Sequence, residues 1–179
     1  VLNSLNMKTD VDFKLNYDVA FNMMTSACLE GIADYCTVFE PTASEYQALG
    51  KWHIVASVGE QSGEIPYTSF IALGSYINNN GETVKSFLKA LKKAHAFIDS
   101  NDEKTVAETI VKQFPSTTIN SIETSLKSYK KINAWKKDLI ATKDSFDRLQ
   151  SVMLNAGELS EKANFNKIVN NSIAEKLLG

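Results

Sequence analysis

Residues 32–50, with the sequence IADYCTVFEPTASEYQALG, decide the predicted fold class. Ile32 to Phe39 is a nearly continuous apolar run, interrupted by only two polar residues, as in a strand that is covered on both faces. Thr42 to Leu49 then has the pattern of a short helix, which Gly50 ends. The stretch therefore predicts a strand followed by a helix.

Similar patterns lie on both sides of this stretch. Apolar and polar residues alternate from Asp10 to Tyr17, which is the period of a half-buried strand. Helical spacing follows from Asp18, a candidate N-cap, to Gly31, and His53 to Val58 is a further apolar run. Three strands that alternate with two helices predict an α/β fold with a parallel or mixed sheet.

The pattern changes beyond residue 58. The segment 59–66 is rich in turn-forming residues and is predicted to be a connector without secondary structure, and 67–73 is one more short apolar run. After Gly74 the apolar residues follow helical spacing almost to the end. Helices are predicted over 84–98, 100–114, 119–129, 146–156 and 165–177.

Composition excludes several classes of protein. The 179 residues are 44% apolar and 22% charged, as is usual for globular proteins of one or two domains. A net charge of -2 gives no general field that would gather nucleic acid or an anionic membrane. No run approaches the roughly 20 apolar residues of a membrane span. The chain begins at Val1 without an initiator Met, so we expect that a part of the natural protein precedes it.

Residue types that commonly carry catalysis are scarce. The sequence contains no nucleotide-binding, nucleophile-elbow, zinc-protease or calcium-loop motif. His53 and His95 have no pairable nucleophile pattern nearby and are expected to be structural. Cys28 and Cys36 fit no metal-binding or redox spacing and are expected to be free, buried thiols. We therefore expect no metal site, no cofactor and no catalytic residue.

Glu40 is the most promising binding residue. It ends the predicted strand 32–39 and precedes Pro41, which would place its carboxylate at the sheet edge where open α/β folds bind their ligands. Phe39 beside it, and Tyr67 with Thr68 after the connector, would supply an aromatic wall and hydroxyl donors. A glutamate in a surface turn is the alternative.

Three runs of this sequence resemble one family. Residues 31–44 (GIADYCTVFEPTAS), 50–59 (GKWHIVASVG) and 62–68 (SGEIPYT) are similar to the nitrate/sulfonate/taurine and thiamine-precursor group of ABC-transporter substrate-binding proteins. FDRLQ at 146–150 and AGEL at 156–159 resemble the C-terminal helices of the same group. The resemblance covers nearly the whole chain but only part of the family's length.

The resemblance implies a type 2 periplasmic-binding-protein-like fold, with two α/β lobes, mixed sheets and a helix-rich C-terminal half. Residues 1–58 would belong to the second, smaller lobe, 59–66 to the hinge, and 67–179 to the C-terminal part of the first lobe. Such a protein captures a small-molecule solute between its lobes and delivers it to an ABC permease. The resemblance also implies an extracytoplasmic location, either in the periplasm or on a lipid anchor.

The expected solute depends on the candidate binding residues, and the resemblance to thiamine-precursor binders implies an acidic partner for the aminopyrimidine near Glu40. The candidate ligand-binding residues are Thr37, Phe39, Glu40, Ser62, Gly63, Tyr67 and Thr68. A carboxylate at the rim favours an amine-bearing solute, such as the pyrimidine precursor of thiamine, over nitrate. Taurine or an alkanesulfonate stays open. We expect Glu40→Ala to weaken binding of an amine with little loss of stability.

Two other functions stay open at this point. Enzymes that make the thiamine pyrimidine share this fold and have a cysteine-rich signature, but the comparable residues 35–39 here contain one cysteine and no histidine. The lysine-rich helices could instead dock a protein partner, although a solvated face explains them more simply. Self-association of this chain is a further expectation, and light scattering would detect it.

Overall fold

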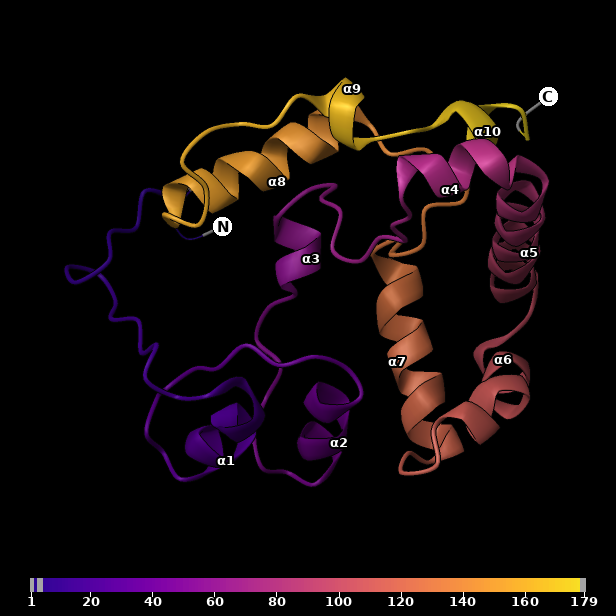
Figure 1. Ribbon diagram of the computed structural model, residues 1–179. Coiled ribbons are helices and arrows are strands. Elements are labelled where there is room, and N and C mark those ends of the chain that lie inside the picture. Colours follow the sequence, from indigo (N-terminus) through magenta and orange to yellow (C-terminus); the bar gives the residue numbers. More distant parts are fainter. Residues whose placement is uncertain (1, 3–4, 178–179) are drawn as a thin grey trace. The chain divides into compact units, whose positions relative to one another are not determined.

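The computed structural model describes residue 2 and residues 5–177 and consists of helices joined by irregular segments (Figure 1). The chain divides into two compact units. Unit 1 comprises the chain up to Ser62 together with Glu103–Ile132, and unit 2 comprises Gly63–Asp102 together with the chain from Asn133 onward. Each unit therefore combines two separate stretches of the sequence. The lobe boundaries expected from the sequence stay a prediction.

Unit 1 is built around a pair of helices, α6 and α7. Its helices are the 3-10 turn η2 (Phe21–Met23), α1 (Met24–Leu29), α2 (Thr42–Ala48), α3 (Val58–Gln61), α6 (Glu103–Ile110), the 3-10 turn η3 (Val111–Gln113) and α7 (Ile119–Lys131). α7 begins where the Thr118 hydroxyl accepts a hydrogen bond from the Ser121 N–H, 3.1 Å away. This cap satisfies an amide that the helix itself leaves unpaired.

The apolar contact between α6 and α7 forms the core of unit 1. Val106 and Ala107 of α6 are 1% and 0% exposed, and Ile122 and Leu126 of α7 are 6% and 4% exposed. An ion pair of 3.1 Å between Lys130 and Glu103 joins the same two helices. Burial of aliphatic side chains is the largest favourable contribution to folding, so these two helices stabilise unit 1.

α2 packs against α7 and supports the only tryptophan of unit 1. The Trp52 indole donates a hydrogen bond of 2.9 Å to the Ala43 carbonyl, and its ring lies 4.9 Å from that of Tyr46. The contact fixes the chain after α2 onto that helix. Trp52 therefore reports on the integrity of unit 1.

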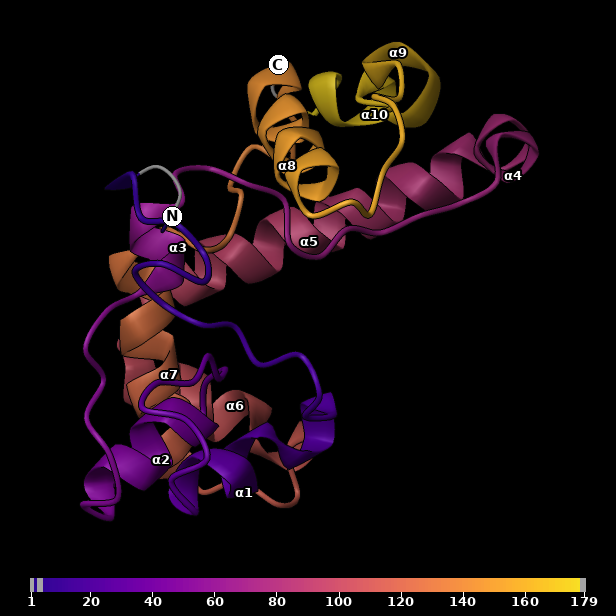
Figure 2. The ribbon, with the colours of Figure 1, turned by 90° about the vertical axis from the view of Figure 1, so that its left-hand side faces the viewer.

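Unit 2 contains the longest helix, α5, which Figure 2 shows along its length. Its helices are α4 (Gly74–Asn79), α5 (Gly81–Ser100), α8 (Lys143–Asn155), α9 (Phe165–Ile168) and α10 (Ser172–Glu175). α10 packs on α5, where Ala174 is 5% exposed and the Lys92 ammonium donates a 2.6 Å hydrogen bond to the Leu177 carbonyl. The C-terminal segment is thereby tied to α5.

The predicted α/β fold with mixed sheets is wrong for this structure. Among the described residues the only β-type pairing is an isolated bridge between Thr9 and Phe13, and no sheet forms. The expected strands 10–17, 32–39, 53–58 and 67–73 run as turns or irregular segments, and α3 begins at Val58. A segment becomes a strand of a sheet only when several consecutive residues pair with a neighbouring segment, and within the described chain the isolated bridge at Phe13 is not extended into such a ladder.

The predicted helices are largely confirmed. Structure and prediction agree for α1, α2, α5, α6, α7 and α8, and Gly31, Gly50 and Gly157 stand at helix ends with φ of 73°, 66° and 76°. Three details differ. Asp18 does not cap α1, the connector 59–66 contains most of α3, and the helix predicted over 165–177 is divided into α9 and α10. Within the described part of the chain, no helix has the length and apolarity needed to cross a membrane.

Candidate functional site

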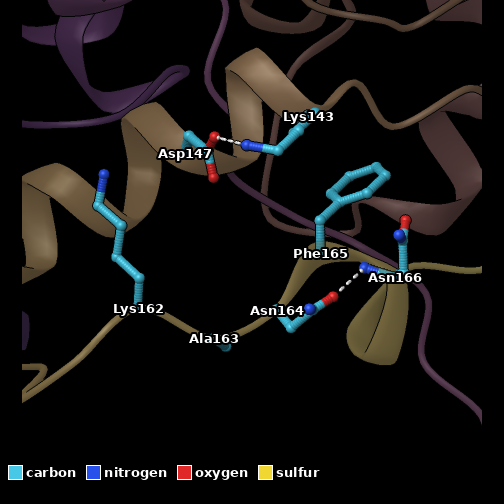
Figure 3. Close-up of a pocket in the computed structure, with 7 residues that line it drawn as sticks. All are labelled: Lys143, Asp147, Lys162, Ala163, Asn164, Phe165 and Asn166. Atoms are coloured by element: carbon cyan, nitrogen blue, oxygen red, sulfur yellow. Dashed lines mark hydrogen bonds and ion pairs between the residues drawn. The ribbon is translucent and has the colours of Figure 1, made fainter.

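A cavity of about 500 Å³ lies in unit 2 between α8 and the segment that leads into α9 (Figure 3). A volume of this size accommodates a small molecule. Its lining consists of Lys143, Asp147, Lys162, Ala163, Asn164, Phe165 and Asn166. Most of these side chains are polar or charged, so the cavity suits a small polar solute.

The charged wall of the cavity comes from the first turns of α8. The Thr142 hydroxyl accepts a 3.3 Å hydrogen bond from the Ser145 N–H and caps the helix. Lys143 and Asp147 are four residues apart, which places them on one face of α8, and their side chains form a hydrogen-bonded ion pair. The helix thus presents an ammonium and a carboxylate side by side.

The segment 162–164 is held against α8 by a buried glutamine. Gln150 is 3% exposed, and its side-chain oxygen accepts a 2.6 Å hydrogen bond from the Ala163 N–H. Its amide nitrogen donates a 3.4 Å hydrogen bond to the Asp147 carboxylate. The Lys162 ammonium donates to the Ser151 hydroxyl at 3.0 Å. These bonds bring a second ammonium, from a different segment, to the cavity.

The remaining wall of the cavity consists of the Phe165 ring and the side-chain amides of Asn164 and Asn166. The Phe165 ring meets that of Phe146 on α8 edge to face, with 5.6 Å between the ring centroids. Asn164 caps α9, because its side-chain oxygen accepts a 2.9 Å hydrogen bond from the Asn166 N–H. The two rings connect α8 with α9, and the cap fixes the chain at the entrance to α9.

The charges of the cavity favour a bound anion. A hydrogen bond from Lys143, with smaller contributions from the charges of Lys143 and Lys162, holds the pKa of the Asp147 carboxyl below its ordinary value. The same pairing raises the pKa of the Lys143 ammonium. Both shifts favour the charged forms of Asp147 and Lys143, and Lys162 adds a second ammonium group to the lining. The arrangement can bind an anionic group and leaves a carboxylate for an amine.

Glu40 lies in unit 1 and caps the start of α2. Its carboxylate accepts hydrogen bonds from the Ser44 N–H at 3.1 Å and from the Ser44 hydroxyl at 2.8 Å. Ser44 is 9% exposed and Glu40 is half-buried. A carboxylate at the first turn of a helix satisfies unpaired amides and interacts favourably with the helix dipole.

The other predicted binding residues are divided between the two units. Thr37 and Phe39 are exposed in unit 1, where the Phe39 ring lies 5.9 Å from that of Phe21, and Ser62 ends α3 as its C-cap. Tyr67 and Thr68 are exposed in unit 2. None of the seven lines the cavity beside α8, and their role in binding stays a prediction.

Gly63 lies close to the side chain of Arg148, which was not among the predicted binding residues. Its φ is 69°, and a Cβ at this position would lie 3.0 Å from Nη1 of Arg148. That guanidinium donates a 2.5 Å hydrogen bond to the Glu64 carbonyl, and the Glu64 carboxylate pairs with Lys136 at 2.9 Å. Only glycine combines this backbone conformation with room for the guanidinium.

The cysteines and histidines take no part in the cavity. Cys28 and Cys36 are free, as predicted, but half-buried, and burial together with a hydrogen bond to Cys28 raises the pKa of Cys36 to about 12. Nδ1 of His95 lies 3.1 Å from the Lys136 carbonyl, which is a structural contact within unit 2. In the described residues, no group of three or more His, Cys, Asp or Glu side chains could hold a metal ion.

Comparison with known proteins supports a role in binding. The chain is 36% identical over 177 residues to a protein of Bacillus subtilis (strain 168) named "Putative binding protein YtlA". The match covers 99% of this chain and 53% of the relative, so the chain spans about half the length of the curated relative that it matches. No protein-family model matches the chain, and no solved structure matches it. The name of the relative describes binding and not catalysis.

Sequence reasoning did not select Lys143, Asp147 and Lys162 as binding residues. The spacing of Lys143 and Asp147 is that of an ion pair on a helix. Such pairs are common on solvent-exposed helix faces, so the spacing does not indicate a binding site. Lys162 lies in a segment without a motif, and its position depends on the fold around Gln150. Local sequence therefore gave no signal for the second ammonium.

The contacts of Glu40 change the expected effect of its removal. In Glu40→Ala, the buried Ser44 loses both hydrogen bonds to the carboxylate, so we expect the free energy of unfolding to fall by about 1 kcal/mol. Urea denaturation followed by Trp52 fluorescence measures this loss. Glu30→Ala is the control, because Glu30 is an exposed carboxylate of the same unit. An unchanged midpoint for Glu40→Ala would contradict the capping role.

Proposed function

We propose that this chain is part of an extracytoplasmic solute-binding component of an ABC importer, and that its solute is a small sulfonate such as taurine or an alkanesulfonate. The protein binds the solute without changing it and delivers it to permease subunits in the membrane. The sequence resemblance of residues 31–44, 50–59 and 62–68, together with the similarity to a protein named for binding, supports this role.

The pair of ammonium groups at the cavity carries the choice of solute. Lys143 projects from α8 and Lys162 from the segment before α9, so two separate elements supply positive charge to one cavity. A lysine ammonium has three donors, and Lys162 uses one of them on the Ser151 hydroxyl. The remaining donors can serve the three oxygens of a sulfonate, which is an acceptor at every accessible pH.

Asp147 and Phe165 match the rest of a taurine-like molecule. The Asp147 carboxylate is partly exposed, with 32% of its side chain accessible, and can accept a hydrogen bond from the amine of a zwitterionic solute. The ring of Phe165 supplies an apolar wall for the carbon atoms between amine and sulfonate. An alkanesulfonate would use the lysines and this ring but not Asp147.

Calorimetric titration of the chain with taurine, ethanesulfonate, an aminopyrimidine and nitrate tests the proposal. We expect heat of binding with at least one of the two sulfonates, and we expect Lys162→Ala to weaken that binding tenfold or more. Lys162→Arg should retain part of the affinity, because it keeps the positive charge. Lys167→Ala is the matched control, since Lys167 is an exposed lysine of α9 that does not line the cavity.

Two outcomes would contradict the proposed solute. The first is that the chain binds the aminopyrimidine, that Glu40→Ala abolishes this binding and that Lys162→Ala leaves it unchanged. Glu40 would then belong to the binding site, and the cavity beside α8 would not. Sulfonate binding that falls equally in Lys162→Ala and Lys167→Ala would show only a general effect of charge, which added salt screens.

A further inference from the structure

The only two cysteines of the chain lie in contact in unit 1. Cys28 belongs to the last turn of α1 and Cys36 to the irregular segment that follows the helix, and a hydrogen bond joins the two thiols. Both side chains are half-buried and free in this structure. A disulfide requires two side chains that point toward each other at short range, and the hydrogen bond between the thiols places them in that arrangement.

The backbone brings the two cysteines together through a reversal at the end of α1. Gly31 has a φ of 73°, and its N–H donates a 3.1 Å hydrogen bond to the Cys28 carbonyl. The Ile32 N–H donates a 3.0 Å hydrogen bond to the Ala27 carbonyl. This pair of bonds around a glycine ends the helix and turns the chain back, so the position of Cys36 beside Cys28 follows from the local backbone.

A second contact shows that the chain after the reversal runs back along the helices before it. The Phe39 ring lies 5.9 Å from that of Phe21 in η2. In sequence this pair encloses the cysteine pair, as expected for a segment that returns beside the preceding one. All residues of η2 and α1 are described, and none of them is buried. Polypeptide regions with so little apolar core are commonly held by disulfides.

The acidity of Cys36 determines how it takes part in thiol–disulfide exchange. Burial, a hydrogen bond to Cys28 and the charge of Cys28 raise the pKa of the Cys36 thiol to about 12. The thiolate is the form that attacks a disulfide, so Cys36 reacts poorly with an external oxidant. A thiol of high pKa is also a poor leaving group. A disulfide that contains Cys36 is therefore slow to be reduced once it has formed.

We propose that Cys28 and Cys36 form an intramolecular disulfide that fixes the segment 32–39 to α1. The Cys28 thiolate attacks one sulfur of an external disulfide, either a small one such as oxidised glutathione or that of a thiol–disulfide oxidoreductase, and displaces one thiolate. The Cys36 thiol then loses its proton, and its sulfur attacks that of Cys28 and displaces the second thiolate. The cysteines are oxidised, the external disulfide is reduced to two thiols, and the two protons of the cysteines pass to these thiols. The proposal concerns unit 1 and does not depend on the solute.

Equilibration of the reduced chain with mixtures of oxidised and reduced glutathione tests the proposal. We expect the chain to lose two hydrogen atoms by mass spectrometry and to resist alkylation at both cysteines. Cleavage after the exposed Glu30 separates the cysteines, so the two peptides should stay joined until a reductant is added. In urea, where only the short separation along the chain favours the bond, the equilibrium constant for oxidation should be lower by about tenfold or more.

The matched control moves one cysteine by a single position. Tyr35→Cys combined with Cys36→Ser keeps two thiols at nearly the same separation, but position 35 is 76% exposed. We expect the equilibrium constant for oxidation of this variant to be about tenfold or more below that of the natural chain, since its thiols do not face each other. In urea the two chains should become equal.

Three outcomes would overturn the proposal. The first is alkylation of both cysteines after equilibration with an excess of oxidised glutathione. The second is a disulfide that joins two copies of the chain. The third is an equilibrium constant that is the same for the natural chain in buffer and in urea, because the folded structure would then contribute nothing to the bond.

Discussion

Leu126→Ala should lower the free energy of unfolding of unit 1 by about 2–4 kcal/mol. Leu126 is 4% exposed on α7, where its side chain belongs to the small core that α6 and α7 share. Truncation to alanine removes buried methyl groups and leaves a cavity that the helices fill only in part. The described residues contain few fully buried apolar side chains, so a single truncation removes a large share of this core.

The two tryptophans allow the loss to be assigned to one unit. Trp52 belongs to unit 1 and Trp135 to unit 2. In a Trp135→Phe background, urea denaturation followed by fluorescence therefore reports on unit 1, through the contact of Trp52 with α2 and of α2 with α7. We expect the Leu126→Ala midpoint to move to clearly lower urea concentration with little change in slope.

Ile119→Ala on the same helix is the control, because Ile119 is 40% exposed. Its truncation should cost less than about 1 kcal/mol, since the side chain already contacts water. Equal losses for Leu126→Ala and Ile119→Ala would mean that burial on α7 does not stabilise unit 1. An unchanged midpoint for Leu126→Ala would contradict the position of the core.

The helices were predictable because each depends on signals within its own residues. α5 carries apolar residues every three or four positions, and Val84, Leu88 and Leu91 of that series are half-buried. α7 and α8 begin at threonine caps, and α1, α2 and α8 end beside glycines with positive φ. These features act within one or two turns of the chain, so they are present in any local stretch of the sequence.

The strands were not predictable because a strand depends on a partner. The run 32–39 and the segment Thr68–Leu73 have the composition of buried strands, but composition cannot say whether a second segment lies alongside. In the structure Tyr35 is 76% exposed and Ile71 is 94% exposed. The apolar pattern of these segments therefore led to a predicted sheet that the described chain does not form.

In the candidate sites, too, the sequence predicts features that depend on local residues and misses those that depend on distant ones. Glu40 was selected as a binding residue because it ends an apolar run, and that role stays a prediction, whereas its bonds to Ser44 depend on the turn into α2. The cavity beside α8 could not be predicted, because Lys143 and Lys162 line one cavity only after the segment 162–164 folds back on α8. Buried Gln150 holds that return through the Ala163 N–H, together with the Lys162–Ser151 hydrogen bond and the ring contact between α8 and α9.

Gln150→Met should open the cavity and destabilise unit 2 by about 1–2 kcal/mol. Methionine has nearly the volume of glutamine, so the substitution removes two hydrogen bonds without creating a large void. The Ala163 N–H loses its 2.6 Å bond, and Asp147 loses a bond of 3.4 Å. Because Ala163 is exposed, its N–H can turn to water, and the segment 162–164 should leave α8.

Three measurements follow this change. Hydrogen exchange at Ala163 should become at least tenfold faster, and fluorescence of Trp135 in a Trp52→Phe background should show a lower urea midpoint for unit 2. Sulfonate binding, if the cavity is the site, should weaken because Lys162 is no longer held at the cavity. Gln113→Met is the matched control, since Gln113 is an exposed glutamine of η3 in unit 1.

The three measurements distinguish a role of Gln150 in positioning the segment 162–164 from a role in the stability of unit 2 alone. A lower midpoint with unchanged exchange at Ala163 would mean that Gln150 stabilises α8 but does not hold the segment 162–164. Faster exchange with unchanged sulfonate binding would mean that Lys162 binds independently of its anchoring to α8. If Gln150 holds the two walls of the cavity together, Gln150→Met should both speed hydrogen exchange at Ala163 and weaken sulfonate binding. The reason is that the Gln150 side chain bonds to Asp147 on one wall and to Ala163 on the other.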